Sequence, residues 1–340
     1  MRIALVDSGV DFSHPDLVHC CDRSQAKCYL RVLTEVDDQN GHGTHLAGII
    51  AGNGHSDVGF RGIAPKAQIL VLRVQGKAKG FLEMDVAEAV SDAVEMGVDI
   101  INLSLGRVSS AGLPPWAWPS RNNALEDAIV EAESRGVLCV VAAGNSGDLP
   151  GSITAPGGIE AALTVGNVCH QLKCGKASSR GPFRRHPSVP SVDGLRFDAM
   201  LMTTTTGLVV SRKPDISCFG EAIGSLNARL PDNENHDAHT QMSGTSQAAA
   251  AVTGLAALAL SELRRSDVNT GPNCARTLRG IFAVAARLPD GGRREALGRG
   301  VVRWPDLQGV VGRAVNDANY AATVHRFADP LIVHPSASTP

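Results

Sequence analysis

The sequence has almost no net charge. Its 340 residues include 32 lysines and arginines and 34 aspartates and glutamates, which give a formal net charge of -2. Basic and acidic residues are interspersed, and the Arg-Arg pairs at 184–185, 264–265 and 293–294 are isolated. Nucleic acids and anionic membrane surfaces are bound by clustered basic residues. We therefore expect no nucleic-acid partner and no membrane-surface partner.

The sequence also lacks a hydrophobic run as long as a transmembrane helix. The apolar run 248–260 is too short, and Thr253 and Gly254 interrupt it. A signal-peptide pattern is missing too, because Met1-Arg2 leads directly into the apolar residues 3–6. We expect no membrane partner. The expected location is cytoplasmic if Met1 is the native start, and secreted if the chain is a trimmed mature form.

Cysteine is sparse for a chain of this length. The eight cysteines are spread along a sequence that is 43% hydrophobic, and a core of that size does not need disulfides. Cys139 lies inside the apolar run 137–143 and is expected to be a buried free thiol. Cys169 and Cys174 flank a short polar loop and could pair or bind a metal, so the redox compartment stays open.

What the sequence does contain is an alternation of short apolar runs and amphipathic segments. Runs rich in Val, Ile and Leu predict strands buried on both faces, at 3–6, 69–74, 98–105, 137–143 and 161–165. Segments 81–96 and 123–135 predict amphipathic helices between them. This order predicts an α/β fold with a mainly parallel central sheet flanked by helices. We expect one domain over 1–330, with insertions near 107–122 and 183–212, and a flexible tail over 331–340.

Three of the predicted strands end in polar residues. The segments concerned are 7–9 (DSG), 102–106 (NLSLG) and 143–147 (AGNSG). The carboxyl ends of parallel strands lie at one edge of a sheet, where ligands and catalytic groups collect. We therefore expect these three segments to converge on a functional site.

The remaining candidates for chemistry are a serine, a histidine and an aspartate. A nucleophilic serine needs a base within hydrogen-bond reach, a carboxylate to orient that base, and donors for the oxyanion. Ser246 opens an alanine-rich predicted helix, where it is either a nucleophile or a plain N-cap. His42 stands between two glycines at a helix start and suits an exposed base. Asp7 could orient this base or cap a turn.

Two histidine pairs have a spacing that could suit metal ligands. His42 and His45 are three residues apart, whereas the common helical zinc motif places its histidines four apart with a glutamate between them. His45 is expected to pack inward. His236 and His239 have the same spacing, in a stretch that reads as a loop. We therefore predict no metal site.

Three blocks of the sequence resemble the signature blocks of the subtilisin-like serine peptidases (subtilases), in that family's Asp, His, Ser order. They are 6–11 (VDSGVD), 42–48 (HGTHLAG) and 244–249 (GTSQAA). Supporting segments also match, at 62–65, 102–106, 142–145, 178–182 and 213–216. The resemblance implies a subtilisin-like three-layer fold. It also implies a serine endopeptidase that acts on peptide or protein substrates, with a narrow-specificity processing or maturation protease as one variant.

The same resemblance implies a role for each matching residue. His42 would take the proton from Ser246, Asp7 would hold His42, and Asn145 would donate its amide to the oxyanion. Ser104, Leu105 and Gly106 would pair with the substrate backbone, with Gly80 on the opposite side. Thr154, Ala155 and Gly157 would line the pocket for the residue before the scissile bond.

The sequence departs from the family's pattern in places that bear on cofactors and activity. No cofactor is implied for the chemistry. Asp16 matches one ligand of a common structural calcium site, but residues 53–59 match its loop poorly, so calcium is possible but unsupported. Ala250 stands where a proline commonly follows the nucleophile block, and a small effect is expected. The alternative function is a catalytically silent binding or scaffold protein on the same fold, against which the intact Asp7, His42, Asn145 and Ser246 argue.

Overall fold

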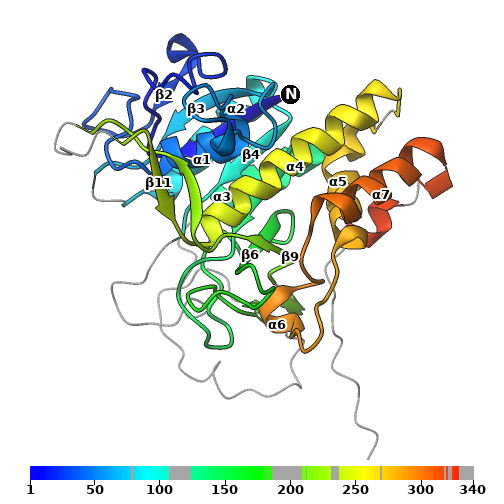
Figure 1. Cartoon of the computed structure of the whole chain (residues 1–340). Helices are drawn as coiled ribbons and strands as arrows, with labels where there is room; N and C mark the ends of the chain where they lie inside the picture. The colour runs from blue at the N-terminus through cyan, green and yellow to red at the C-terminus, as the bar shows by residue number, and fades with distance from the viewer. Residues whose placement is uncertain are drawn as a thin grey trace, which may run out of the picture.

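A seven-stranded parallel sheet forms the centre of the molecule in this computed structural model (Figure 1). The structure describes residues 1–77, 80–106, 124–181, 183–185, 209–211, 213–230, 237–268, 270–317, 319–320 and 324–328. The strand order is β2-β3-β1-β4-β5-β6-β9. Their bounds are β1 Arg2–Asp7, β2 Lys27–Cys28, β3 Gln68–Arg73, β4 Ile100–Leu103, β5 Leu138–Ala142, β6 Leu163–Val168 and β9 Ile216–Phe219.

Helices cover both faces of this sheet, as the alternating sequence pattern predicts. One apolar cluster joins Ala4 and Val6 of β1 to α2 (Glu83–Glu95) and α3 (Ala124–Ser134). The other joins Ile3 and Leu5 to four helices on the opposite face: α1 His42–Ala51, α4 Thr245–Arg265, α5 Cys274–Ala285 and α7 Trp304–Asn316. Because successive side chains of a strand point to opposite faces, one apolar strand serves both clusters. The predicted three-layer α/β fold is confirmed.

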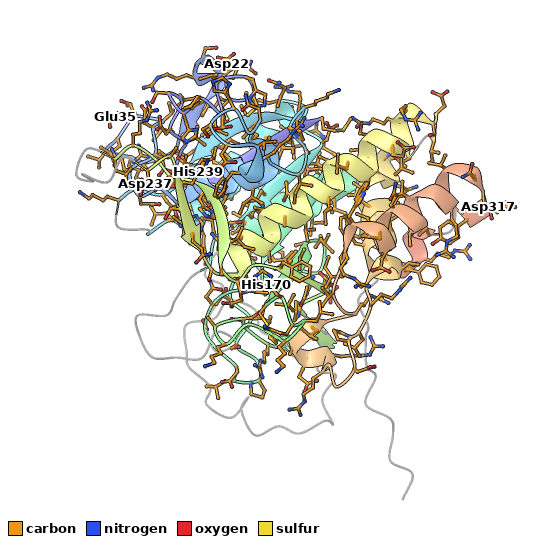
Figure 2. The ribbon with its side chains drawn as sticks, viewed as in Figure 1. Asp22, Glu35, His170, Asp237, His239 and Asp317 are labelled. Carbon is orange, nitrogen blue, oxygen red and sulfur yellow. The ribbon has the colours of Figure 1, made fainter. Side chains whose placement is uncertain are left out.

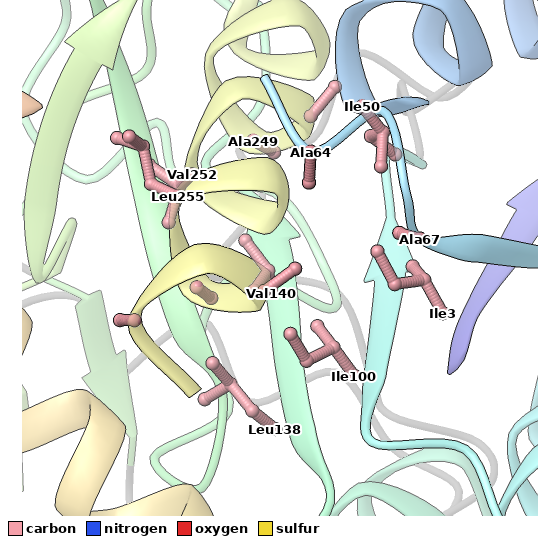
Figure 3. Close-up of a cluster of buried hydrophobic side chains, with 14 of the residues drawn as sticks. Ile3, Ile50, Ala64, Ala67, Ile100, Leu138, Val140, Ala249, Val252 and Leu255 are labelled. Atoms are coloured by element: carbon pink, nitrogen blue, oxygen red, sulfur yellow. The ribbon is translucent and has the colours of Figure 1, made fainter. Parts of the chain in front are cut away.

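The central helix α4 packs its small and aliphatic side chains on the middle of the sheet. Figure 3 shows Ala249, Val252 and Leu255 of α4 beside Leu138 and Val140 of β5. The helix runs to Arg265, which is further than the apolar run of its sequence. By length and composition it meets the criterion for a membrane span, but 78% of its apolar window is buried inside the protein. A core helix satisfies the same criterion, and the packing shows that α4 is one.

Shorter elements complete the described part of the chain. The antiparallel hairpin of β10 (Ile223–Leu226) and β11 (His239–Met242) leads into α4 and packs beside α1 (Figure 1). A second antiparallel pair, β7 (Phe183–Arg185) and β8 (Val209–Ser211), lies at the two ends of the expected 183–212 insertion. The remaining elements are α6 Arg294–Leu297 and the 3-10 turns η1 Arg23–Gln25, η2 Val58–Phe60, η5 Gly271–Asn273 and η6 Val324–Ala328. The expected insertion 107–122 and tail 331–340 lie outside the described residues.

All eight cysteines are free thiols in this structure. Cys139 lies in β5 and is buried, as the sequence predicts, and burial raises the pKa of its thiol to about 12. Such a thiol stays protonated and unreactive at neutral pH. Cys169 and Cys174 flank a tight turn, and neither is disulfide-bonded.

Candidate active site

The polar ends of β1, β4 and β5 meet the first turns of α1 and α4 at one edge of the sheet. Asp7 is the last residue of β1, and its carboxylate bonds His42 at the start of α1. Ser104, just beyond β4, accepts a hydrogen bond from Ser246 in the first turn of α4. Asn145, after β5, is bonded to Thr245. The site is assembled because parallel strands send their carboxyl ends to the same edge.

Asp7 and His42 form a short, mostly buried pair. The Asp7 side chain is completely buried, and its Oδ1 lies 2.7 Å from His42 Nδ1. Oδ1 also accepts the backbone N–H of Ser8 at 2.8 Å, whereas Oδ2 is buried without a hydrogen-bond partner among the described residues. An ionised carboxylate in such surroundings gains most from a positive neighbour. The His42 side chain is 17% exposed, so its ring is partly accessible from outside the protein.

Asp38 anchors the turn that presents His42, and the sequence analysis did not single it out. Its Oδ1 accepts the Ser8 hydroxyl and the backbone N–H of Gly41, both at 2.9 Å. Its Oδ2 accepts the backbone N–H of Thr44 at 2.9 Å and the Thr44 hydroxyl at 2.7 Å. The sequence signal that could have identified Asp38 is its position just ahead of a predicted helix start, where negative charge is favoured. Asp38 thus fixes α1 to the end of β1.

Ser246 is held against the end of β4 by reciprocal hydrogen bonds. Its Oγ donates to the Ser104 carbonyl at 3.2 Å, and the Ser104 hydroxyl reaches the Ser246 carbonyl at 3.2 Å. The Ser104 hydroxyl also lies 2.9 Å from Asn102 Oδ1, and the Asn102 amide donates to Thr253 of α4 at 2.9 Å. These bonds position the first turn of α4, whose N-terminal end favours negative charge.

Asn145 has its side-chain oxygen occupied, so its amide nitrogen is the donor available to a ligand. Asn145 Oδ1 accepts the backbone N–H of Thr245 at 3.0 Å and lies 3.1 Å from the Thr245 hydroxyl. That hydroxyl is also 3.2 Å from the backbone nitrogen of Gly144. The bonding pattern fixes which end of the amide is oxygen. Asn145 is exposed next to Ser246, in a position suited to an oxyanion donor.

The residues that the sequence analysis expects to contact substrate differ in their exposure to solvent. Gly106 is exposed, whereas Leu105 is buried below it. Thr154 is buried, and its carbonyl accepts the Gly157 N–H at 2.7 Å, so Gly157 closes a turn across Ala155. Gly80 is exposed, and the neighbouring Lys79 lies outside the described residues.

His45 packs inward, as the sequence predicts. It is completely buried on α1, with its Nε2 3.1 Å from the Ile223 carbonyl of β10. Burial lowers the pKa of His45 to about 4, so the ring is neutral at pH 7. The residues that the structure describes contain no group of three or more His, Cys, Asp or Glu placed to hold a metal ion.

Asp16, the residue matching a common calcium ligand, is surrounded by hydrogen-bond donors. Its carboxylate accepts the backbone N–H groups of His55 and Ser56 and the Ser56 hydroxyl. Burial raises the pKa of Asp16, but the bonds from Ser56 and His55 outweigh it, and the pKa is lowered. Among the described residues, no group of three or more His, Cys, Asp or Glu that could hold a metal ion includes Asp16.

The Ser56 hydroxyl also connects Asp16 to the hairpin that precedes Ser246. It lies 3.1 Å from Nε2 of His239, whose ring stacks on Phe60 at 3.8 Å. Figure 2 shows His239 and the nearby Asp237 on the hairpin side of the molecule. His239 is therefore a packed residue at the start of β11.

Comparison with known proteins places the chain in a family. The Subtilase family matches residues 1–300. A thermophilic serine proteinase of Bacillus sp. (strain AK1) is 30% identical over 267 residues, which are 78% of this chain and 53% of that protein. The major intracellular serine protease of Bacillus subtilis (strain 168) is 35% identical over 179 residues, 49% of this chain and 51% of that protein. The chain thus spans about half the length of these two relatives.

Solved structures agree on the architecture. Sphericase matches with a TM-score of 0.66 at 26% identity, over 89% of this chain and 90% of that one. The prenylagaramide maturation protease PagA matches with a TM-score of 0.67 at 23% identity, over 92% of this chain and 94% of that one. The likeness to PagA concerns the fold alone. Taken with the family match over residues 1–300, these findings show that the chain belongs to the subtilase family.

Proposed function

We propose that this protein is a serine endopeptidase that cleaves peptide bonds through an acyl-enzyme intermediate, with Asp7, His42 and Ser246 as its catalytic triad. The observation that carries the proposal is the 2.7 Å bond between the buried Asp7 carboxylate and His42, at the sheet edge where Ser246 opens α4. Membership of the subtilase family supports the same reading.

The described contacts and membership of the subtilase family support a task for each group in the reaction. Asp7 accepts from Nδ1–H of His42, which leaves Nε2 as the basic nitrogen. His42 takes the Ser246 proton as Oγ attacks the peptide carbonyl, and Asp7 stabilises the imidazolium that forms. Asn145 and the backbone N–H of Ser246 donate to the oxyanion. His42 then protonates the leaving amine, and a water molecule releases the acyl group by the same steps in reverse order.

Within this activity we propose a processing protease of narrow specificity. PagA and PatA, which share the fold, are described as maturation proteases. The sequence pattern predicts insertions at 107–122 and 183–212, and loop insertions usually narrow the specificity of an enzyme.

Active-site labelling tests the proposal directly. The protein is treated with a serine-directed fluorophosphonate, and the modified residue is located by mass spectrometry, with the Ser246→Ala variant as control. We expect labelling at Ser246 that is lost in the variant. A folded wild-type protein that is not labelled and that cleaves no peptide would favour the catalytically silent scaffold instead.

A further inference from the structure

We propose that Asn167, a buried residue of β6, is a positioning residue that holds the two oxyanion donors of this site in place, with Glu221 as its partner. The inference rests on the proposed function, because it concerns the groups that stabilise the oxyanion in that reaction. It follows from the bonds of Asn167 to two segments of the chain, one that supports Asn145 and one that supports Ser246.

The residues on either side of Asn145 are held by Ser179. The backbone N–H of Ser179 donates to the Gly144 carbonyl at 2.9 Å, and its Oγ accepts the Ser146 N–H at 3.0 Å. Ser179 is completely buried, and hydrogen bonds in such surroundings are stronger than bonds in contact with water. The backbone from which the Asn145 side chain projects is therefore fixed by this one serine.

Asn167 connects β6 to the segment that carries Ser179. Asn167 is completely buried, and its backbone N–H donates to the Ser178 hydroxyl at 3.0 Å. Its carbonyl accepts the Gly175 N–H at 2.9 Å. Because Ser178 and Ser179 are adjacent, the bonds of Asn167 help to set the position of the residue that is bonded on both sides of Asn145.

The side chain of Asn167 bonds a second segment, which leads into β10. Its amide nitrogen donates to Glu221 Oε1 at 2.7 Å. A carboxylate acceptor makes this hydrogen bond stronger than a bond between two neutral groups. Asn167 Oδ1 has no hydrogen-bond partner among the described residues, so the bond to Glu221 is the one that orients the amide.

The residue before Glu221 is bonded to the segment that carries Ser246. The Gly220 carbonyl accepts the Gly244 N–H at 2.8 Å, and Gly244 lies two residues before Ser246. A Cβ atom added to Gly220 would lie 2.6 Å from Asn167 Oδ1 and would also overlap with the Gly244 carbonyl. The absence of a side chain at Gly220 therefore lets three segments of the chain come close together behind Ser246.

The residue after Glu221 is also bonded to the segment that leads to Ser246. Ala222 has a φ of +55°, a left-handed conformation that is unfavourable for a residue with a side chain. Its N–H donates to the Ser243 hydroxyl at 2.8 Å, and its carbonyl accepts the Gln241 side-chain amide at 3.1 Å. A shift of Glu221 would therefore displace the backbone that precedes Ser246.

Asn167 thus supports both proposed donors from one buried position. The Asn145 amide and the Ser246 N–H must reach the same oxygen atom, and a misplacement of 1 Å in an active site can cost about 100-fold in rate. These donors act on the charge that develops in the transition state. Loss of their alignment should therefore lower kcat and leave KM nearly unchanged.

Variants of Glu221 and Asn167 test the proposal by steady-state hydrolysis of a peptide. Glu221→Ala removes the acceptor at a partly exposed position and should lower kcat by about 10- to 100-fold, with KM changed by about twofold or less. Glu221→Gln keeps an acceptor oxygen for the Asn167 amide and should restore most of the lost rate. Glu262→Ala, which alters an exposed glutamate in the last turn of α4, is the matched control and should keep the wild-type rate.

Two combinations of variants separate positioning from a general loss of stability. Asn167→Ala added to Glu221→Ala should lower kcat no further, because both substitutions remove the same bond. In an Asn145→Ala background one donor is already absent, so Glu221→Ala should lower kcat by about threefold or less. A loss of stability alone would lower the rate equally in both backgrounds. The Glu221 variants carry the test if Asn167→Ala does not fold.

Three results would overturn the proposal. The first is a kcat for Glu221→Ala within about twofold of the wild type, and the second is a rise in KM at constant kcat. The third is full additivity of Glu221→Ala and Asn145→Ala, because independent effects would mean that Glu221 does not act through the alignment of the donors.

Fluorophosphonate labelling of Ser246 distinguishes this failure from that of the proposed function. A wild type that is labelled and active, with kcat unchanged in Glu221→Ala, overturns only the role of Asn167 and Glu221. A folded wild type that is neither labelled nor active overturns the proposed function, and the positioning role with it.

Discussion

At the scale of single residues, the candidate site depends on groups that are each oriented by a hydrogen bond to a neighbouring residue. Asp7 fixes one ring nitrogen of His42, and Thr245 fixes the oxygen of the Asn145 amide. In each case a hydrogen bond inside the protein orients a group that we propose to act on the substrate. Preorganisation of this kind avoids reorientation during the reaction, which is why the loss of one group is expected to be costly.

Replacing Asp7 by asparagine should lower kcat by about 10⁴-fold, because an amide favours the wrong tautomer of His42. KM should change little, since the buried side chain does not touch substrate. Steady-state hydrolysis of a peptide measures both constants. Asp22→Asn, which changes an exposed cap of η1, is the matched control and should retain full activity. A fall of less than about tenfold for Asp7→Asn would contradict the assigned role.

Replacing Asn145 by alanine should lower kcat by about 10²–10³-fold with KM nearly unchanged, which is typical of a lost oxyanion donor. Thr245 also loses its side-chain acceptor, so thermal unfolding must be followed in parallel. If KM rises while kcat stays constant, Asn145 binds the ground state rather than the oxyanion.

At the scale of elements, the position of the base depends on how α1 begins. Gly41 precedes the helix without a side-chain cap of its own, and Asp38 accepts hydrogen bonds from Ser8, Gly41 and Thr44 in its place. One carboxylate therefore connects the end of β1, which carries Asp7, to the first turn of α1, which carries His42. The relative position of the base and its orienting group is set by this connection.

Removing this carboxylate by Asp38→Ala should lower the free energy of unfolding by about 3 kcal/mol, because several buried donors lose their acceptor at once. Urea unfolding in a Ser246→Ala background measures this without self-digestion. Asp22→Ala in the same background, which removes an exposed cap, should cost about 1 kcal/mol or less. Equal effects of the two substitutions would show that Asp38 is no more than a surface cap.

At the scale of the whole molecule, two layers of helices protect the sheet and bury polar groups along with apolar ones. His45 is the clearest case, because α1, which packs on β1, also holds the β10–β11 hairpin through this buried ring. Its pKa of about 4 lies below the ordinary value of 6.5. The unfolded chain therefore binds a proton that the folded protein does not bind between these pH values, and stability falls as the pH drops through this window.

Between pH 7 and pH 5, His45 should contribute a loss of about 2 kcal/mol in the free energy of unfolding, at 1.36 kcal/mol per pKa unit. Urea unfolding of Ser246→Ala at the two pH values measures the total loss. In the Ser246→Ala, His45→Gln double variant, the loss of unfolding free energy between pH 7 and pH 5 should be smaller by about 2 kcal/mol. This difference should hold even if the double variant is less stable at both pH values. His19→Gln, which alters an exposed histidine, should leave the loss unchanged. An undiminished loss in His45→Gln would refute the assignment.

The sequence by itself determined the sheet and the identity of the chemical groups. Residues 3–6 and 137–143 are apolar at every position, and short runs of this kind are typical of strands buried on both faces. The strands are parallel, so the polar residues that follow their carboxyl ends meet at one edge of the sheet. The buried state of Cys139 and of His45 followed from the same local patterns.

Only the tertiary structure decided what surrounds those groups. Asp38, the hydrogen-bonded surroundings of Asp16, and the position of Thr154 between Gly106 and Gly144 join segments far apart in the chain. The hydrophobic periodicity of one segment does not encode such contacts. Each contact depends on how the loops that follow two or three different strands pack together at the edge of the sheet. The hairpin of β10 and β11 was missed for the same reason, because its strands are short and only partly buried. Local pattern and the family resemblance therefore identified the candidate groups, and packing between distant segments gave their positions.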